Sequence, residues 1–117
     1  MTPAKVILLI IFTLMLGVGQ LLFKSASRVL VGIAPSGAVG ALVRSPVFYL
    51  ALILYGCATL LWIWIIRDVP LSRAYCFAAL CFVIVPALAA IFLGEPWSWK
   101  VLAGAVIIAV GIVVTQL

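Results

Sequence analysis

Long apolar stretches alternate along this chain with short clusters of charged and turn-forming residues. Between the charged side chains lie four uncharged stretches of 17 to 21 residues, at 6–23, 46–66, 74–94 and 101–117. A helix rises about 1.5 Å per residue and the hydrocarbon core is about 30 Å thick, so each stretch is long enough to span as a helix. Helices also satisfy every backbone polar group in lipid, whereas four strands cannot close a barrel. The pattern predicts an all-α integral membrane protein, a single four-helix transmembrane domain with helices at about 3–28, 46–66, 73–93 and 98–117.

The segments that connect the apolar stretches are of two kinds, tight polar turns and one longer segment. Residues 67–72 and 94–100 form tight polar connections, whereas 29–45 contains a Pro-Ser-Gly turn signal between flanks too short to span. We expect 29–45 to be an interfacial helix–turn or a loop that partly enters the headgroups. Pro86 removes a backbone hydrogen bond within the third span and predicts a kink near Phe82. Four spans place both termini on one side, but the basic residues are divided too evenly to fix the orientation.

Composition narrows the class of protein. Of 117 residues, 69% are hydrophobic and 8% are charged, with two acids and no His. A soluble domain is nearer half apolar and a quarter charged, so a soluble or disordered chain is excluded. No phosphate-binding glycine loop, nucleophile elbow or metal-ligand cluster occurs. We therefore expect a protein that is not an enzyme and needs no cofactor or metal, and whose net charge of +5 meets anionic lipid headgroups rather than nucleic acid.

One face of the first helix carries the most informative side chains. Thr13, Gly17, Gln20, Lys24 and Arg28 recur at helical spacing, and we expect this face to line the bundle interior, with Gln20 needing a polar partner. Lys24 is the leading substrate-binding candidate, because a Lys deep in a span costs about 2.5–3.5 kcal/mol and usually has a task. The alternative for Lys24 is snorkelling to the far interface. For Arg28 an interface anchor is the main interpretation and substrate binding the second.

Aromatic and basic residues on the second and third helices supply further candidates for the substrate site. Tyr55 and Trp62 share a helical face and could stack against a sugar ring, or simply pack. Tyr75 combines a ring with a hydroxyl, and the alternative for it is an interfacial aromatic belt. Arg73 is suited to bind a phosphate through a bidentate fork, or to pair with Asp68.

Two features near the fourth helix suggest structural roles. Gly104 and Gly111 are seven residues apart on one face, which is a helix-packing signal, here across a dimer or alternatively within the bundle. Glu95 precedes this helix in a Gly-Glu-Pro turn. We expect Glu95 to cap the helix or to neutralise Lys100, rather than to take part in catalysis.

Taken together, these residues resemble the small multidrug resistance proteins and their EamA-like relatives in the drug/metabolite transporter superfamily. The matching features are four short spans, Gly19 and Lys24 late in the first, Ala74-Tyr75 opening the third, and the spacing of Gly104 and Gly111. The resemblance implies a small four-helix bundle that pairs with a second copy or a similar subunit. Drug-exporting members carry a membrane-embedded Glu eight residues before that Lys, where this chain has Leu16. The resemblance therefore does not extend to their proton-coupled export.

The closer resemblance is to the branch that moves lipid-linked sugars, the subunits of the aminoarabinose-phosphoundecaprenol flippase. Four motifs match in order: Gly19-Gln20-Leu21 with Lys24, Val69-Pro70 with Ala74-Tyr75, Phe82-Val83 with Val85, and Glu95-Pro96 with Ser98. This resemblance implies flipping of an undecaprenyl-phosphate-linked sugar across the bacterial inner membrane. Such a cargo needs a cation to bind the phosphate and a polar cleft to hold the sugar. Lys24 with Gln20, together with Arg28 or Arg73, could bind the phosphate. The alternatives are a small-molecule exporter coupled through Asp68 or Glu95, and a non-transporting partner subunit.

Overall fold

The computed structural model describes residues 2–117, and within that range the chain is helical and has no strand. The elements are α1 (Pro3–Ser27), the short 3₁₀ turn η1 (Arg28–Leu30), α2 (Pro35–Val43), α3 (Pro46–Ile66), α4 (Leu71–Ala78), α5 (Cys81–Phe92) and α6 (Trp99–Gln116). Four helical stretches in this part of the chain are long and apolar enough to cross a membrane: Pro3–Leu30, Pro46–Ile66, Leu71–Phe92 and Trp99–Gln116. The expected all-α membrane architecture is thus confirmed, although the third span is divided into α4 and α5.

Local sequence signals set several of the helix ends. α1 begins at Pro3, whose missing N–H is not needed in a first turn, and the Thr2 hydroxyl accepts a 3.4 Å hydrogen bond from the Lys5 N–H. Pro46 has the same place at the start of α3. After α5, Gly94 adopts a φ of +64°, a conformation that L side chains rarely adopt, and the chain turns back sharply there.

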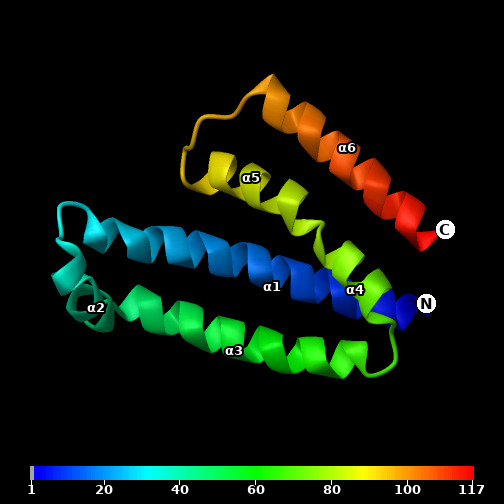
Figure 1. Cartoon of the computed structure of the whole chain (residues 1–117), viewed down its shortest axis with the longest axis horizontal. Coiled ribbons are helices and arrows are strands. Elements are labelled where there is room, and N and C mark those ends of the chain that lie inside the picture. The colour runs from blue at the N-terminus through cyan, green and yellow to red at the C-terminus, as the bar shows by residue number, and fades with distance from the viewer. Residues whose placement is uncertain (1) are drawn as a thin grey trace.

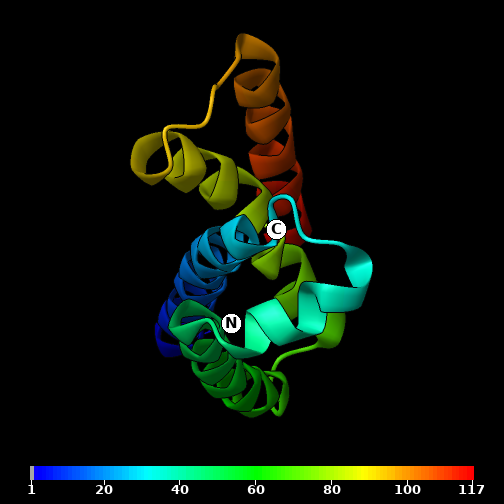
Figure 2. The ribbon, with the colours of Figure 1, turned by 90° about the vertical axis from the view of Figure 1, so that its left-hand side faces the viewer.

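The four spans lie in the order α3, α1, α4–α5, α6, with both described ends of the chain at one end of the bundle (Figure 1). α1 and α3 form the main antiparallel pair, and α5 packs against α1 on the side away from α3 (Figure 2). The buried core lies between α1, α3 and the start of α4. It consists of Leu9, Phe12, Ala58, Ile65, Val69 and Ala74.

The third span is broken at Ala79 and Leu80. Here the backbone makes tight bonds three residues apart, since the Phe82 N–H donates to the Ala79 carbonyl at 2.9 Å. The break lies N-terminal to the kink expected near Phe82, and Pro86 itself is accommodated inside α5. Beyond the break α5 packs against α1, where a Cβ on Gly17 would approach the Ile84 side chain at 3.2 Å. The small Gly17 thus allows α5 to pack closely on α1 beyond the break.

Segment 29–45 contains a turn followed by a short helix. Gly32 adopts a φ of +78° after η1, and α2 then begins at Pro35. α2 buries none of its residues and lies at the end of the bundle where α1 finishes and α3 begins (Figure 1). The segment therefore has the helix–turn form, one of the two forms expected for it.

α6 is the outermost span and buries none of its residues within this chain. A Cβ built on Gly104 or on Gly111 meets no atom within 4 Å. The glycine face of α6 is therefore not used for close packing inside the described bundle. Packing across a dimer remains the prediction for these two glycines.

Candidate functional site

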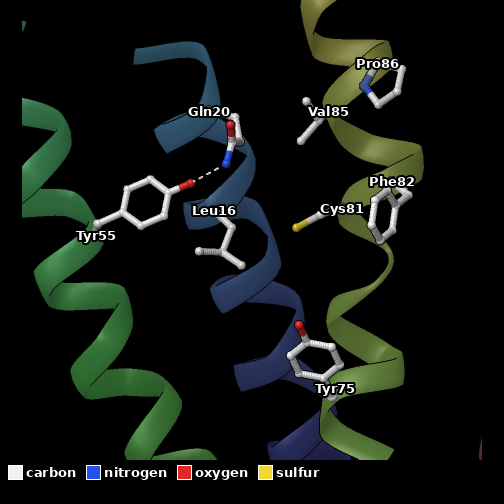
Figure 3. Close-up of a pocket in the computed structure, with 8 residues that line it drawn as sticks. All are labelled: Leu16, Gln20, Tyr55, Tyr75, Cys81, Phe82, Val85 and Pro86. Atoms are coloured by element: carbon white, nitrogen blue, oxygen red, sulfur yellow. Dashed lines mark hydrogen bonds between the residues drawn. The ribbon is translucent and has the colours of Figure 1, made fainter. Parts of the chain in front are cut away.

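A cavity of about 530 Å³ opens between α1, α3 and the α4–α5 segment (Figure 3). It is lined by Leu16, Gln20, Tyr55, Tyr75, Cys81, Phe82, Val85 and Pro86. A second cavity of about 250 Å³ shares four of these residues and adds Phe12, Trp62, Ala78 and Ala79. We call the two cavities together the interhelical groove. It brings together four of the residues predicted for a substrate site: Gln20, Tyr55, Trp62 and Tyr75.

Tyr55 is held in the groove by consecutive turns of α1. The Gln20 side-chain amide donates a 2.7 Å hydrogen bond to the Tyr55 hydroxyl, which supplies the polar partner expected for Gln20 (Figure 3). Phe23 stacks on the Tyr55 ring at a centroid distance of 4.6 Å. Gly19 lies against the same ring so closely that any Cβ there would overlap it. Because the Tyr55 hydroxyl accepts from Gln20, its own proton can be donated to a ligand.

Trp62 and Tyr75 form the aromatic wall of the second cavity. Trp62 stacks on Phe12 with ring centroids 4.8 Å apart, so one of its faces is used for packing. The Tyr75 ring meets Trp62 edge-on at 6.4 Å and is 70% exposed. Its hydroxyl is directed into the space between α1 and the α4–α5 segment (Figure 3). This end of the groove therefore offers exposed aromatic surface and one free hydroxyl.

Leu16 lines both cavities, at the point where they meet. This is the position at which the drug exporters that the sequence resembles carry an acid. Among the described residues that line the groove there is no carboxylate. The groove thus offers an amide, hydroxyls and aromatic rings to the hydroxyl groups of a ligand, and no acid that could exchange protons.

Lys24 lies one helical turn beyond Gln20 on the same face of α1. Its Nζ atom is 3.8 Å from Oε1 of Glu95, and the two side chains are 56% and 42% exposed. Lys24 is not among the residues that line the two cavities and stands at their end instead. At 3.8 Å the two atoms are too far apart for a direct hydrogen bond, so the contact between them is loose.

Glu95 neither caps α6 nor pairs with Lys100 in the structure. Ser98 is the N-cap of α6, because its Oγ accepts a 3.3 Å hydrogen bond from the Val101 N–H. The Glu95 carboxylate pairs with Lys24 rather than with Lys100. The positive φ of Gly94 turns the chain back over the end of α5, which brings Glu95 toward α1.

Arg28 and Arg73 lie at opposite ends of the bundle and do not line the groove. Arg28 is exposed in η1, beyond the end of α1. Arg73 is in the first turn of α4, and its carbonyl accepts a 3.2 Å hydrogen bond from the Gln116 side chain. Asp68 pairs with Arg67 at 3.0 Å rather than with Arg73. One phosphate cannot contact Arg28 and Arg73 at the same time.

Some groove residues were not among the sequence candidates. Cys81, Phe82, Val85 and Pro86 all line the larger cavity from α5. The last three share one helical face, and the proline in an apolar span is a signal that could have drawn attention to them. Nothing in the sequence singles out Cys81, whose thiol lies 3.5 Å from the Thr13 carbonyl where α5 meets α1.

Comparison with known proteins gives one consistent set of relatives. The chain is 35% identical over 106 residues to a protein of Pseudomonas aeruginosa (strain UCBPP-PA14), covering 91% of both chains. It is 34% identical over 105 residues to one of Pseudomonas aeruginosa (strain LESB58), covering 90% of both. A third match, to a protein of Enterobacter sp. (strain 638), is 38% identical over 64 residues, which is 55% of this chain and 60% of that protein.

Each of these relatives is named "Probable 4-amino-4-deoxy-L-arabinose-phosphoundecaprenol flippase subunit ArnE". No family model matches the chain. No solved structure matches it either. The Pseudomonas relatives match this chain over nine tenths of its length. The chain therefore belongs to the ArnE family of flippase subunits.

Proposed function

We propose that this chain is a subunit of a flippase that moves an undecaprenyl-phosphate-linked aminoarabinose across the bacterial inner membrane. Relatives of nearly equal length are named for this activity. Four apolar helical spans make the chain a multi-pass membrane protein, as that task requires. The observation that carries the proposal beyond the family name is the interhelical groove, which is polar at Gln20 and Tyr55 and holds no carboxylate.

The groove is suited to the sugar head of such a lipid. Pockets for small molecules are commonly about 300–1,000 Å³, and the larger cavity here has about 530 Å³. The Gln20 amide and the hydroxyls of Tyr55 and Tyr75 match sugar hydroxyls, and the exposed ring of Tyr75 offers a surface for stacking. The polyprenyl tail has no need of the groove, because it is equally stable in the surrounding lipid.

We assign the phosphate to basic residues at the two ends of the bundle. Lys24 stands one turn beyond Gln20, and Arg28 is one turn further along. Trp62 and Tyr75 lie toward the opposite end, where α4 begins with Arg73 close by. In this proposal Lys24 and Arg28 bind the phosphate at one end of the bundle, where the lipid head either enters or leaves. Arg73 binds the phosphate at the other end.

A proton-coupled exporter of cationic molecules has less support. Such a mechanism needs an acid that both the proton and the substrate can reach. Asp68 is bound by Arg67 outside the groove, and Glu95 is paired with Lys24 at its end. Neither acid lines the interhelical groove.

A second chain completes the proposal. The relatives are named as subunits, and four helices alone cannot enclose a sugar head. We propose that α6 packs against another copy or a similar subunit through its unpacked face at Gly104 and Gly111.

The proposal is tested by translocation in cells that make the lipid-linked aminosugar. A membrane-impermeant, amine-reactive reagent labels only the heads that have reached the outer face. The variant Lys24→Ala should lower the labelled fraction by about 10- to 100-fold, the equivalent of one hydrogen bond to a charged group. Lys100→Ala, at the same end of the bundle but in α6, should behave as wild type. Labelling that is the same with and without the chain contradicts the proposed function.

A further inference from the structure

We propose that Glu95 recognises the amino group of the sugar, and that the Lys24–Glu95 ion pair is the empty form of a two-point site for a zwitterionic head. This inference rests on the proposed function and extends it to substrate specificity. The sugar-phosphate head of an aminosugar lipid carries one anionic phosphodiester and one cationic ammonium group. Lys24 and Glu95 present the two complementary charges side by side.

The pair bridges the two walls of the groove. Lys24 belongs to α1, on the face that carries Gln20. Glu95 follows α5, whose residues Val85 and Pro86 line the larger cavity. A head that enters or leaves the groove at this end would therefore come close to both charges.

The position of Glu95 is built by the backbone. Gly94, with a φ of +64°, turns the chain, and the Glu95 N–H then donates a 3.3 Å hydrogen bond to the Ala89 carbonyl in the last turns of α5. The carboxylate is thereby held near α1 instead of at the start of α6, where Ser98 already caps the helix. Glu95 therefore does not cap α6, and its carboxylate faces Lys24 instead.

Glu95 is also the acid best placed for this task. The chain has two acids, Asp68 and Glu95. Asp68 Oδ2 accepts two hydrogen bonds from the Arg67 guanidinium, at 3.0 and 3.2 Å, outside the groove. By contrast, the Lys24 Nζ and Glu95 Oε1 atoms are 3.8 Å apart, which is too far for a direct hydrogen bond, so a ligand can displace this contact more easily than the Arg67–Asp68 pair.

Charge balance explains why such a pair would select aminosugars. When a zwitterionic head binds, the phosphate replaces Glu95 at Lys24 and the ammonium replaces Lys24 at Glu95, so every charge keeps a partner. A neutral sugar phosphate would satisfy Lys24 but leave Glu95 unpaired beside a second anion, which is unfavourable. Glu95 therefore disfavours binding of lipid-linked sugars that lack the amine and favours binding of those that carry it.

The test compares a head that carries the ammonium group with one in which N-acetylation removes that charge. Membrane vesicles from cells that express the full chain are loaded with aminoarabinose-phosphoundecaprenol or with its N-acetylated form, and the rate of translocation of each is measured by mass spectrometry of the exposed fraction. Wild type should prefer the free amine by about tenfold, the effect of one charge-assisted hydrogen bond. Glu95→Gln should abolish this preference, Glu95→Asp should restore part of it, and Asp68→Asn should keep it.

The ratio of the two rates is independent of how much protein each variant yields. Equal rates for the two heads in wild type, or an unchanged ratio in Glu95→Gln, would overturn the inference while leaving the proposed function intact. If wild type moves neither head faster than vesicles without the chain, the proposed function itself fails.

Discussion

The side-chain amide of Gln20 donates a 2.7 Å hydrogen bond to the hydroxyl of Tyr55, and this contact joins α1 to α3 at the wall of the groove. The same tyrosine ring lies on Gly19 and stacks on Phe23. One short segment of α1 thus fixes where Tyr55 stands, and the groove depends on that segment.

Replacing Gly19 by Ala should displace the Tyr55 ring, because a Cβ at position 19 would overlap it. Overpacking of this kind costs about 1–3 kcal/mol, and we expect a lower thermal unfolding midpoint in detergent together with slower translocation. Gly56→Ala is the matched control, since a Cβ there meets nothing within 4 Å. If the clash is the cause, Tyr55→Leu in the Gly19→Ala background should recover the stability. Unfolding midpoints that stay equal for Gly19→Ala and Gly56→Ala would contradict this packing.

Tyr55→Phe should impair transport more than stability. It removes the acceptor of the Gln20 amide and the hydroxyl that faces the cavity, while the ring can still stack on Phe23. A lost hydrogen bond of this kind contributes about 0.5–1.5 kcal/mol to stability, whereas a sugar would lose a direct contact. Tyr49→Phe, on the same helix but away from the groove lining, should leave translocation unchanged. An equal effect of the two substitutions on translocation would argue against a binding role for Tyr55.

Ser98→Ala should destabilise α6, because Ser98 Oγ accepts the hydrogen bond from the Val101 N–H. Loss of an N-cap costs about 0.5–2 kcal/mol. Glu95→Gln should have a smaller effect on the unfolding midpoint, since its exposed pair with Lys24 contributes little. The two midpoints can be compared in the same detergent. A larger loss for Glu95→Gln than for Ser98→Ala would mean that Glu95 supports the helix after all.

Gly104→Val and Gly111→Val should weaken assembly but not the bundle. Both positions are open within the chain, so a larger side chain meets no neighbour of its own chain. Cross-linking in membranes should show fewer two-chain species for these variants, whereas Ala103→Val, at an exposed position of the same helix, should keep them. If the variant that carries both substitutions forms as many two-chain species as wild type, the face with Gly104 and Gly111 is not the contact between the chains.

The spans could be predicted from the sequence because lipid imposes simple rules on length and charge. α3 covers residues 46–66, between Pro46 and the charged Arg67, as the uncharged stretch indicates. The break at Ala79 was not predictable in the same way. The segment that follows the break packs closely on Gly17 of α1, which is a tertiary contact that no local pattern encodes.

The candidate site was predictable where it follows helix periodicity. The face of α1 that carries Gln20 and Lys24 could be found by counting residues, but its contact with Tyr55 joins positions far apart in the chain. Glu95 shows the limit of local reasoning. A Gly-Glu-Pro turn before a helix suggests a cap, yet the positive φ of Gly94 turns the acid toward Lys24 instead.

The central claim is that Lys24 meets the phosphate of the lipid. Native mass spectrometry can measure it directly, by comparing retention of undecaprenyl phosphate and of undecaprenol by the purified chain. Wild type should retain the phosphorylated lipid about tenfold better, and Lys24→Gln should retain the two lipids equally. If Lys24→Gln keeps the full preference for the phosphate, Lys24 is not its binding residue and the account is contradicted.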